Sequence, residues 1–152
     1  MSDLTCTIEG VAETPARLAA SARQFKIVVD EPPVLGGNDQ GANPLEYLLA
    51  SYAGCINVVA HLTAKELGIK LSGLKIQVEG SINPARLFGQ SDEERAGFKQ
   101  INVSFLPETD AKTEEVEKWI LAIKNRCPIY DNLSSSTPLT FNFVRKPEPV
   151  AL

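Results

Sequence analysis

The sequence predicts an α+β protein with antiparallel sheets and a long buried central helix. Six short segments alternate apolar and polar residues or are rich in β-branched residues, as half-buried strands are. Two longer segments instead repeat apolar residues at spacings of three and four, which predicts helices. Three strands precede the first helix, two separate the helices and one follows, and strands grouped in this way favour antiparallel pairing.

The first three strands are predicted at residues 4–8, 17–23 and 25–29. Residues 4–8 alternate inward Leu4, Cys6 and Ile8 with outward threonines, so we expect Cys6 to be a small apolar filler. Residues 17–23 are only weakly patterned, whereas residues 25–29 are β-branched and end before two prolines. The loop over residues 31–42 is rich in turn formers, but no Gly-Lys-Ser/Thr follows it, which disfavours a phosphate-binding loop.

The central helix is predicted to begin at Asn43 and to end before Gly68. Asn43 is a suitable cap, Pro44 fits the first helical position, and Glu46 can complete a capping box with Asn43. An apolar stripe follows at helical spacing, so its members are expected to face whatever the helix packs against. The stripe consists of Leu48, Tyr52, Cys55, Val59 and Leu62.

The second half of the chain is predicted to contain strands at residues 74–78 and 98–105, joined by a polar connection over 83–97. A second helix covers residues 113–126, a polar turn lies at 134–136, and a last strand lies at 139–144. Cys127 is eleven residues after the inward-facing Val116, close to three full turns, so it should also point inward. A thiol pair between Cys55 and Cys127 is therefore possible.

The composition indicates one domain over residues 1–152, with a tail at 146–152 that is expected to fray. A net charge of −4 without clustered Lys and Arg argues against nucleic-acid binding. The apolar stretch at residues 47–62 is shorter than a membrane span and contains polar residues. Three cysteines without a secretory signal fit a reducing, cytoplasmic location. One histidine, His61, and three separated cysteines lack metal-ligand spacing, so no metal or other cofactor is expected.

The middle of the central helix is unusual because Gly54 lies beside other small residues and costs about 1 kcal/mol relative to alanine. A helix that is apolar on nearly every side must be covered on nearly every side. One further helix and a sheet are too little cover, so we expect a homodimer with this helix at its centre.

Three short motifs resemble the osmotically inducible protein C and organic hydroperoxide resistance family, OsmC/Ohr. They are Gly-Ala-Asn-Pro at 41–44, Ala-Gly-Cys at 53–55 and Arg-Cys-Pro at 126–128. The resemblance implies the OsmC-like fold, an intertwined homodimer and the reduction of organic hydroperoxides in the response to oxidative stress. It implies that Cys55 attacks the peroxide, that Cys127 resolves the sulfenic acid as a disulfide, and that an external dithiol reduces the disulfide.

The resemblance also implies that an N-terminal arginine stabilises the Cys55 thiolate and that a glutamate early in the central helix holds this arginine. Arg17 and Arg23 are the available arginines, and we favour Arg17. The family acid directly follows Asn-Pro, where this chain has Leu45, and Glu46 comes one residue later. Nine residues at about 100° each place Glu46 opposite Cys55 on the helix, so capping explains it. The substitution at Leu45 favours an alternative, a noncatalytic protein that binds a hydrophobic ligand in the dimer cleft.

Overall fold

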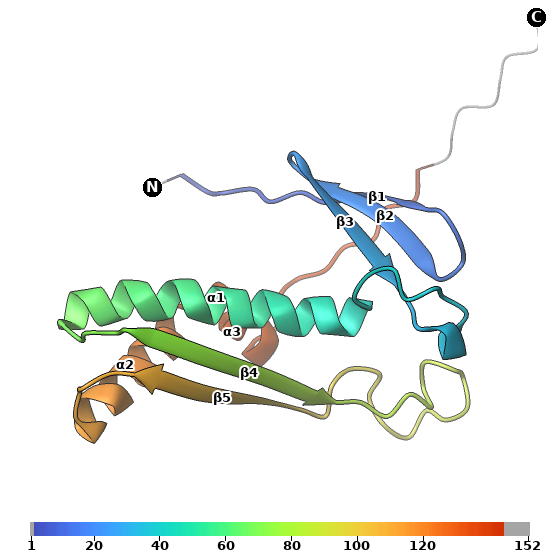
Figure 1. Ribbon diagram of the computed structural model, residues 1–152. Helices are drawn as coiled ribbons and strands as arrows, with labels where there is room; N and C mark the ends of the chain where they lie inside the picture. The colour runs from blue at the N-terminus through green and yellow to red at the C-terminus, as the bar shows by residue number, and fades with distance from the viewer. Residues whose placement is uncertain (1, 145–152) are drawn as a thin grey trace, which may run out of the picture.

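The computed structural model describes residues 2–144. The tail predicted to fray, residues 146–152, lies outside the described residues. The described part contains a three-stranded antiparallel sheet and a two-stranded antiparallel sheet, with a long helix between them in the sequence. Figure 1 shows the three-stranded sheet near the start of that helix, while the two-stranded sheet runs along the helix. The predicted α+β class with antiparallel sheets is therefore confirmed.

The three-stranded sheet consists of β1 (Glu9–Ala12), β2 (Arg17–Ala22) and β3 (Phe25–Asp30) in that order. The turn between β1 and β2 is fixed by Thr14, whose hydroxyl accepts hydrogen bonds from the N–H groups of Ala16 and Arg17. The prediction of a first strand at residues 4–8 is wrong. This turn sets the register, and β2 is too short to pair with residues much before Glu9. Cys6 is consequently exposed rather than a core filler.

The loop before the long helix is organised by Asp30, which is only 1% exposed. Its carboxylate accepts hydrogen bonds from the backbone N–H groups of Glu31, Asn38 and Gln40 at 3.0, 3.1 and 3.2 Å. The loop includes a 3₁₀ turn, η1 (Pro33–Leu35), and returns to β3 at Gly41. A Cβ atom at Gly41 would lie 2.1 Å from a β3 carbonyl oxygen, so only glycine permits this approach. The backbone donors that could bind a phosphate are thus occupied by Asp30.

Helix α1 spans Pro44–Leu67 and begins with the predicted capping box. The Asn43 side chain accepts from the Glu46 N–H, and the Glu46 carboxylate accepts from the Asn43 N–H, both at 2.9 Å. The helix ends at Gly68, whose φ of 70° is the left-handed conformation that glycine tolerates best. Asn43, Glu46 and Gly68 therefore confirm the predicted ends of the helix.

The buried face of α1 is rotated from the predicted stripe. Leu48 and Leu62 are 38% and 47% exposed, so their predicted inward orientation is wrong for a single chain. The reason is that α2 and β4 cover only one side of the helix. The buried residues are Tyr52, Ile56, Val59, Ala60, Thr63 and Ala64.

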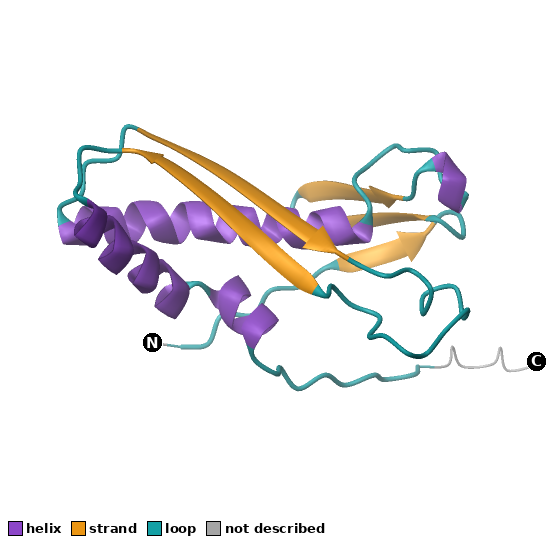
Figure 2. Ribbon diagram, turned by 90° about the horizontal axis from the view of Figure 1, so that it is seen from below, coloured by secondary structure: helices purple, strands orange, loops and turns teal. Residues whose placement is uncertain are grey.

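The rest of the chain contains β4 (Gly73–Ser81), β5 (Gln100–Glu108), α2 (Thr113–Arg126) and α3 (Pro128–Ser134). β4 and β5 pair antiparallel along their full length. Figure 2 shows this pair crossing α1, while α2 starts near one end of α1 and α3 follows it toward the middle of the molecule. Helix α3 was not predicted. The predicted strand at residues 139–144 is absent from the structure, because no strand in the described chain pairs with it.

The length of α1 corrects the argument that its apolar stretch is too short to span a membrane. The helix continues past the predicted apolar stretch to 24 residues, which is long and apolar enough to cross a bilayer by length and composition alone. The core helix of a soluble protein satisfies the same criterion. α1 packs against both α2 and β4, as a core helix does.

Candidate active site at two cysteines

The packing of α2 against α1 brings together the two cysteines that the sequence singled out. Trp119 of α2 is fully buried, and its indole N–H donates a hydrogen bond of 2.9 Å to the Ala60 carbonyl of α1. The Trp119 ring also meets Phe105 of β5 edge-on, with ring centres 5.0 Å apart. These contacts lock α2 between the helix and the sheet, and Cys127 lies at the end of α2.

Cys127 occupies the junction between two helices. Its N–H donates to the Ile123 carbonyl at 3.0 Å, which ends α2, and its sulfur accepts from the Tyr130 N–H at 3.5 Å, which begins α3. Cys127 Sγ lies 3.0 Å from Cys55 Sγ and donates a hydrogen bond to it. A disulfide bond is about 2.05 Å long, so a movement of about 1 Å would suffice to form one.

The two sulfurs differ in exposure. Cys55 is partly exposed, whereas Cys127 is only 2% exposed. Burial raises the pKa of the Cys127 thiol, and its hydrogen bond to Cys55 raises the pKa further, although the Tyr130 N–H opposes both effects. Cys127 is therefore held as a neutral thiol, while Cys55 is the sulfur that a reagent from outside can reach.

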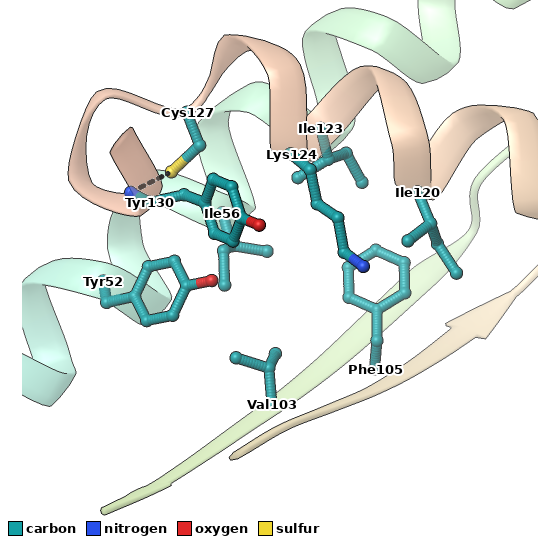
Figure 3. A pocket seen from close by; sticks show the side chains of 9 residues that line it. All are labelled: Tyr52, Ile56, Val103, Phe105, Ile120, Ile123, Lys124, Cys127 and Tyr130. Atoms are coloured by element: carbon teal, nitrogen blue, oxygen red, sulfur yellow. Dashed lines mark hydrogen bonds between the residues drawn. The ribbon is translucent and has the colours of Figure 1, made fainter. Parts of the chain in front are cut away.

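A mainly apolar cavity of about 200 Å³ adjoins Cys127. Figure 3 shows the phenolic oxygens of Tyr52 and Tyr130 directed into the space between α1, β5 and α2. Burial raises the pKa of Tyr52, and negative charge on Cys127, Tyr130 and Cys55 raises it further. The lining residues are Tyr52, Ile56, Val103, Phe105, Ile120, Ile123, Lys124, Cys127 and Tyr130.

A second, larger cleft of about 400 Å³ shares Tyr52 and Tyr130 with the first cavity. Leu45 and Leu48 from the start of α1 form part of its apolar wall, and Arg95 adds a positive charge. The two tyrosines therefore stand between the cleft and the cavity beside Cys127. Leu48 and Tyr52, two members of the apolar stripe of α1, thus both line this cleft.

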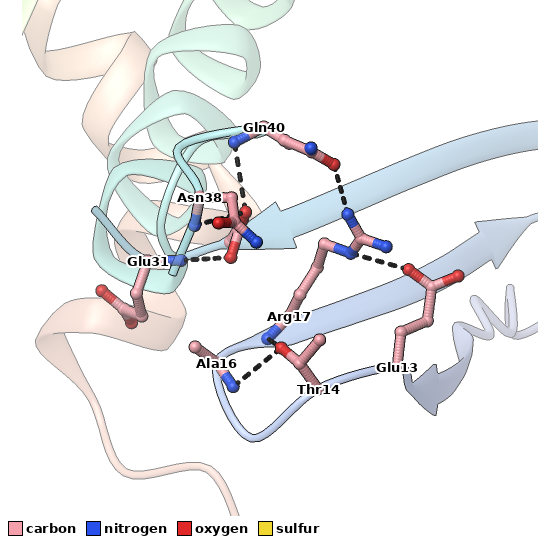
Figure 4. A network of polar contacts seen from close by, with 8 residues as sticks. Glu13, Thr14, Ala16, Arg17, Glu31, Asn38 and Gln40 are labelled. Carbon is pink, nitrogen blue, oxygen red and sulfur yellow. Dashed lines mark hydrogen bonds and ion pairs between the residues drawn. The ribbon is translucent and has the colours of Figure 1, made fainter. Parts of the chain in front are cut away.

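Arg17 lies at the start of β2, opposite Asp30 on β3, and is directed toward the loop before α1 (Figure 4). Its Nη1 donates a hydrogen bond to the Gln40 side-chain oxygen. Its Nε lies 2.8 Å from a Glu13 carboxylate oxygen, an ion pair without hydrogen-bond alignment. Within residues 2–144 of a single chain, no hydrogen bond or ion pair joins Arg17 to Cys55.

The remaining candidates also lie apart from the sulfurs. Arg23 lies in the turn between β2 and β3 with a φ of 55°, and its guanidinium is 5.0 Å from the centre of the Phe25 ring. Glu46 is occupied in the capping box. His61 is exposed, and its Nδ1 is 2.8 Å from the Asn57 carbonyl. The structure of a single chain thus brings together the two cysteines but neither arginine nor Glu46.

Sequence reasoning missed Tyr130 and Asp30. Tyr130 follows Cys127 by three residues, the spacing of a helix cap and its partner, but cysteine is an uncommon cap and the helix was not recognised. Asp30 ends a β-branched strand before a glycine-rich loop, a position at which a buried carboxylate often holds backbone N–H groups. No cluster of three metal-binding side chains occurs among the described residues.

Comparisons with known proteins identify the family of the chain. The profile of the OsmC-like protein family matches residues 36–142. A hydroperoxide reductase of Mycoplasma genitalium is 26% identical over 135 residues, which cover 89% of this chain and 91% of that protein.

Solved structures show the same fold. An OsmC-like protein from Mycoplasma pneumoniae has a TM-score of 0.76 at 24% identity, covering 89% of this chain and 91% of the other. An organic hydroperoxide resistance protein from Legionella pneumophila has a TM-score of 0.63 at 19% identity, covering 88% and 91% of the two chains.

Proposed function

Because this chain belongs to the OsmC-like protein family, we propose that it reduces organic hydroperoxides with Cys55 and Cys127. The observation that carries the proposal is the 3.0 Å separation of the two sulfurs, one of which, Cys127, lines an apolar cavity. The relative from Mycoplasma genitalium, named a hydroperoxide reductase, supports the same chemistry.

The exposure of the sulfurs assigns their roles in this proposal. The Cys55 thiolate attacks the terminal oxygen of the hydroperoxide, a sulfur–oxygen bond forms, and the O–O bond breaks to release an alcohol. The Cys127 thiol then attacks the Cys55 sulfenic acid, which yields a disulfide and water. An external dithiol reduces the disulfide by exchange and returns both thiols.

The substrate class follows from the lining of the cavity. Most side chains around it are aliphatic or aromatic, and such a surface gains little from hydrogen peroxide but buries an alkyl group favourably. We therefore propose alkyl or lipid hydroperoxides as substrates. The proposed reaction requires no metal or other cofactor, because the Cys55 sulfur supplies the two electrons that reduce the peroxide.

The active form in this proposal is a homodimer. In the single chain one side of α1 is uncovered, with Val58 65% exposed and Leu62 47% exposed, and burying such a surface favours association. A second copy would also supply the cation that a Cys55 thiolate needs. We propose Arg17 of the partner subunit for this role, in preference to Arg23.

Thiol titration tests the proposed function. One equivalent of cumene hydroperoxide per chain should remove two of the three thiols in the reduced protein, and Cys6→Ser should still lose two. Cys55→Ser should lose none, because no sulfenic acid forms. Cys127→Ser should leave a Cys55 sulfenic acid that dimedone traps. If the wild-type thiols persist, the reaction is absent, and binding of a hydrophobic ligand becomes the better account of the cavity.

A further inference from the structure

The two tyrosines between the cavity and the cleft have no assigned role in the reaction described above. Within residues 2–144, neither phenolic oxygen has a hydrogen-bond partner, although Tyr52 is only 8% exposed. By contrast, the third tyrosine, Tyr47, donates its hydroxyl proton to the Val28 carbonyl at 2.9 Å. Both tyrosines line the cavity and the cleft, so a molecule bound there meets phenolic O–H groups that no protein atom within these residues occupies.

The reaction itself creates a need for a hydrogen-bond donor. When the Cys55 thiolate attacks a hydroperoxide, the electrons of the O–O bond move to the departing oxygen, which leaves as an alkoxide. An alkoxide is a strong base, and a positioned acid that protonates it speeds the step. The Cys127 S–H is already directed at the Cys55 sulfur, so it does not serve the departing oxygen.

Tyr52 is better placed for this task than Tyr130. It lies three residues before Cys55 on α1, and residues at that spacing are neighbours on one helix face. Its phenol is close enough to feel the charge of both cysteines, and its raised pKa keeps the proton on the oxygen at neutral pH. Tyr130 is half-buried on α3, where its N–H holds the sulfur of Cys127.

We propose that the Tyr52 hydroxyl protonates the oxygen that leaves when Cys55 attacks the hydroperoxide. The inference rests on the proposed function. The thiolate and hydroperoxide give the sulfenic acid and an alkoxide, the alkoxide takes the phenolic proton and leaves as an alcohol, and water returns a proton to the phenolate. Tyr52 is thus a catalytic residue for alkyl hydroperoxides, because it touches the departing oxygen.

The test compares two oxidants that differ in their leaving groups. tert-Butyl hydroperoxide releases an alkoxide that needs a proton, whereas peracetic acid releases acetate, which does not. Single-turnover oxidation of Cys55 is measured in the reduced wild-type protein, in Tyr52→Phe, in Tyr130→Phe and in Tyr47→Phe. Tyr47→Phe is the matched control, because it removes a phenolic hydroxyl that is bonded to β3.

Tyr52→Phe should react about 100-fold more slowly with tert-butyl hydroperoxide and within about twofold of the wild-type rate with peracetic acid. The peracid rate also shows that the variant is folded with its sulfurs in place. Tyr47→Phe should react normally with both oxidants.

Three results would overturn the assignment of Tyr52. They are equal slowing with both oxidants, unchanged rates, and a selective loss in Tyr130→Phe instead of Tyr52→Phe. If the wild-type protein reacts with neither oxidant, the proposed function fails and the role of Tyr52 fails with it. A reactive wild type with an unaffected Tyr52→Phe would remove only the role of Tyr52.

Discussion

At the scale of single residues, the two cysteines differ in their hydrogen-bond role and in their exposure, although their side chains are chemically identical. The buried partner keeps its proton, and the partly exposed partner accepts the hydrogen bond and faces the reagent. The helix dipoles oppose each other at Cys127, because the C-terminus of α2 disfavours an anion there while the N-terminus of α3 favours one. Burial and the hydrogen bond to Cys55 support the resolving role that we propose for Cys127.

The raised pKa of Cys127 predicts how stability depends on pH. An unfolded cysteine ionises near pH 8.5, whereas the buried Cys127 holds its proton to higher pH, mainly because burial penalises its thiolate. Between these two pKa values the unfolded chain binds fewer protons than the folded chain, so the free energy of unfolding must fall as pH rises. One proton limits this slope to about 1.4 kcal/mol per pH unit.

Urea unfolding under reducing conditions between about pH 8 and 9 measures this slope, because tyrosines are still mostly protonated there. Cys127→Ala should lower stability and flatten the slope, whereas the exposed Cys6→Ala should leave the slope unchanged. A wild-type slope retained in Cys127→Ala would assign the pH dependence to another group.

The sulfur pair could be predicted from the sequence, because the inward direction of both cysteines follows from helical periodicity, which is a local property. Cys55 and Cys127 were both placed toward the core, and the structure brings them within 3.0 Å. Tyr130 could not be predicted, because its position beside Cys127 depends on α3, a helix of seven residues capped by cysteine. The position of Arg17 relative to Cys55 depends on the assembly, which local patterns do not encode.

At the scale of elements, the start of α1 is determined by local chemistry. The reciprocal hydrogen bonds between Asn43 and Glu46 satisfy backbone donors that the helix itself leaves free. The same locality explains why both ends of α1 were predicted correctly. The strand predicted at residues 139–144 failed for the opposite reason, because a strand exists only with a partner and apolar alternation does not identify one.

The capping box yields a test that separates structural and catalytic roles for Glu46. Asn43→Ala should lower the free energy of unfolding by about 1 kcal/mol, because one N–H at the helix start loses its acceptor. Glu46→Gln keeps an acceptor for the Asn43 N–H and should change stability little. Chemical denaturation measures both effects.

Neither substitution should alter the rate at which cumene hydroperoxide oxidises Cys55, because neither residue contacts the sulfurs in the described chain. A Glu46→Gln variant with normal stability but tenfold slower oxidation would instead place Glu46 in the active site, acting across the interface between subunits.

At the scale of the whole molecule, a single chain leaves much apolar surface in contact with water. The exposed positions lie on separate elements, namely β1, β3, the far side of α1 and the extended segment after α3. Scattered apolar residues are ordinary, but this many exposed large apolar side chains on one small chain support the homodimer that we propose. Val11, Phe25, Val58, Leu62, Leu139 and Phe141 are the clearest examples.

Gly54 offers a direct test of whether two copies meet along α1. A Cβ atom at this position would find no other atom within 4 Å in the single chain, so the isolated fold accepts a larger side chain there. Alanine would even favour the helix by about 1 kcal/mol. In a dimer with α1 at its centre, by contrast, a large side chain would separate the two helices.

Gly54→Trp should therefore remain folded but raise the dimer dissociation constant at least about tenfold, equivalent to 1.4 kcal/mol. Sedimentation velocity across a dilution series measures the constant, and Glu117→Trp, on the exposed face of α2, is the matched control. If Arg17 of the partner subunit supports the Cys55 thiolate, oxidation by cumene hydroperoxide should slow in parallel with dissociation. A Gly54→Trp variant that dimerises as tightly as the wild type would place the interface elsewhere, and a monomer with full activity would show that one chain suffices for the reaction.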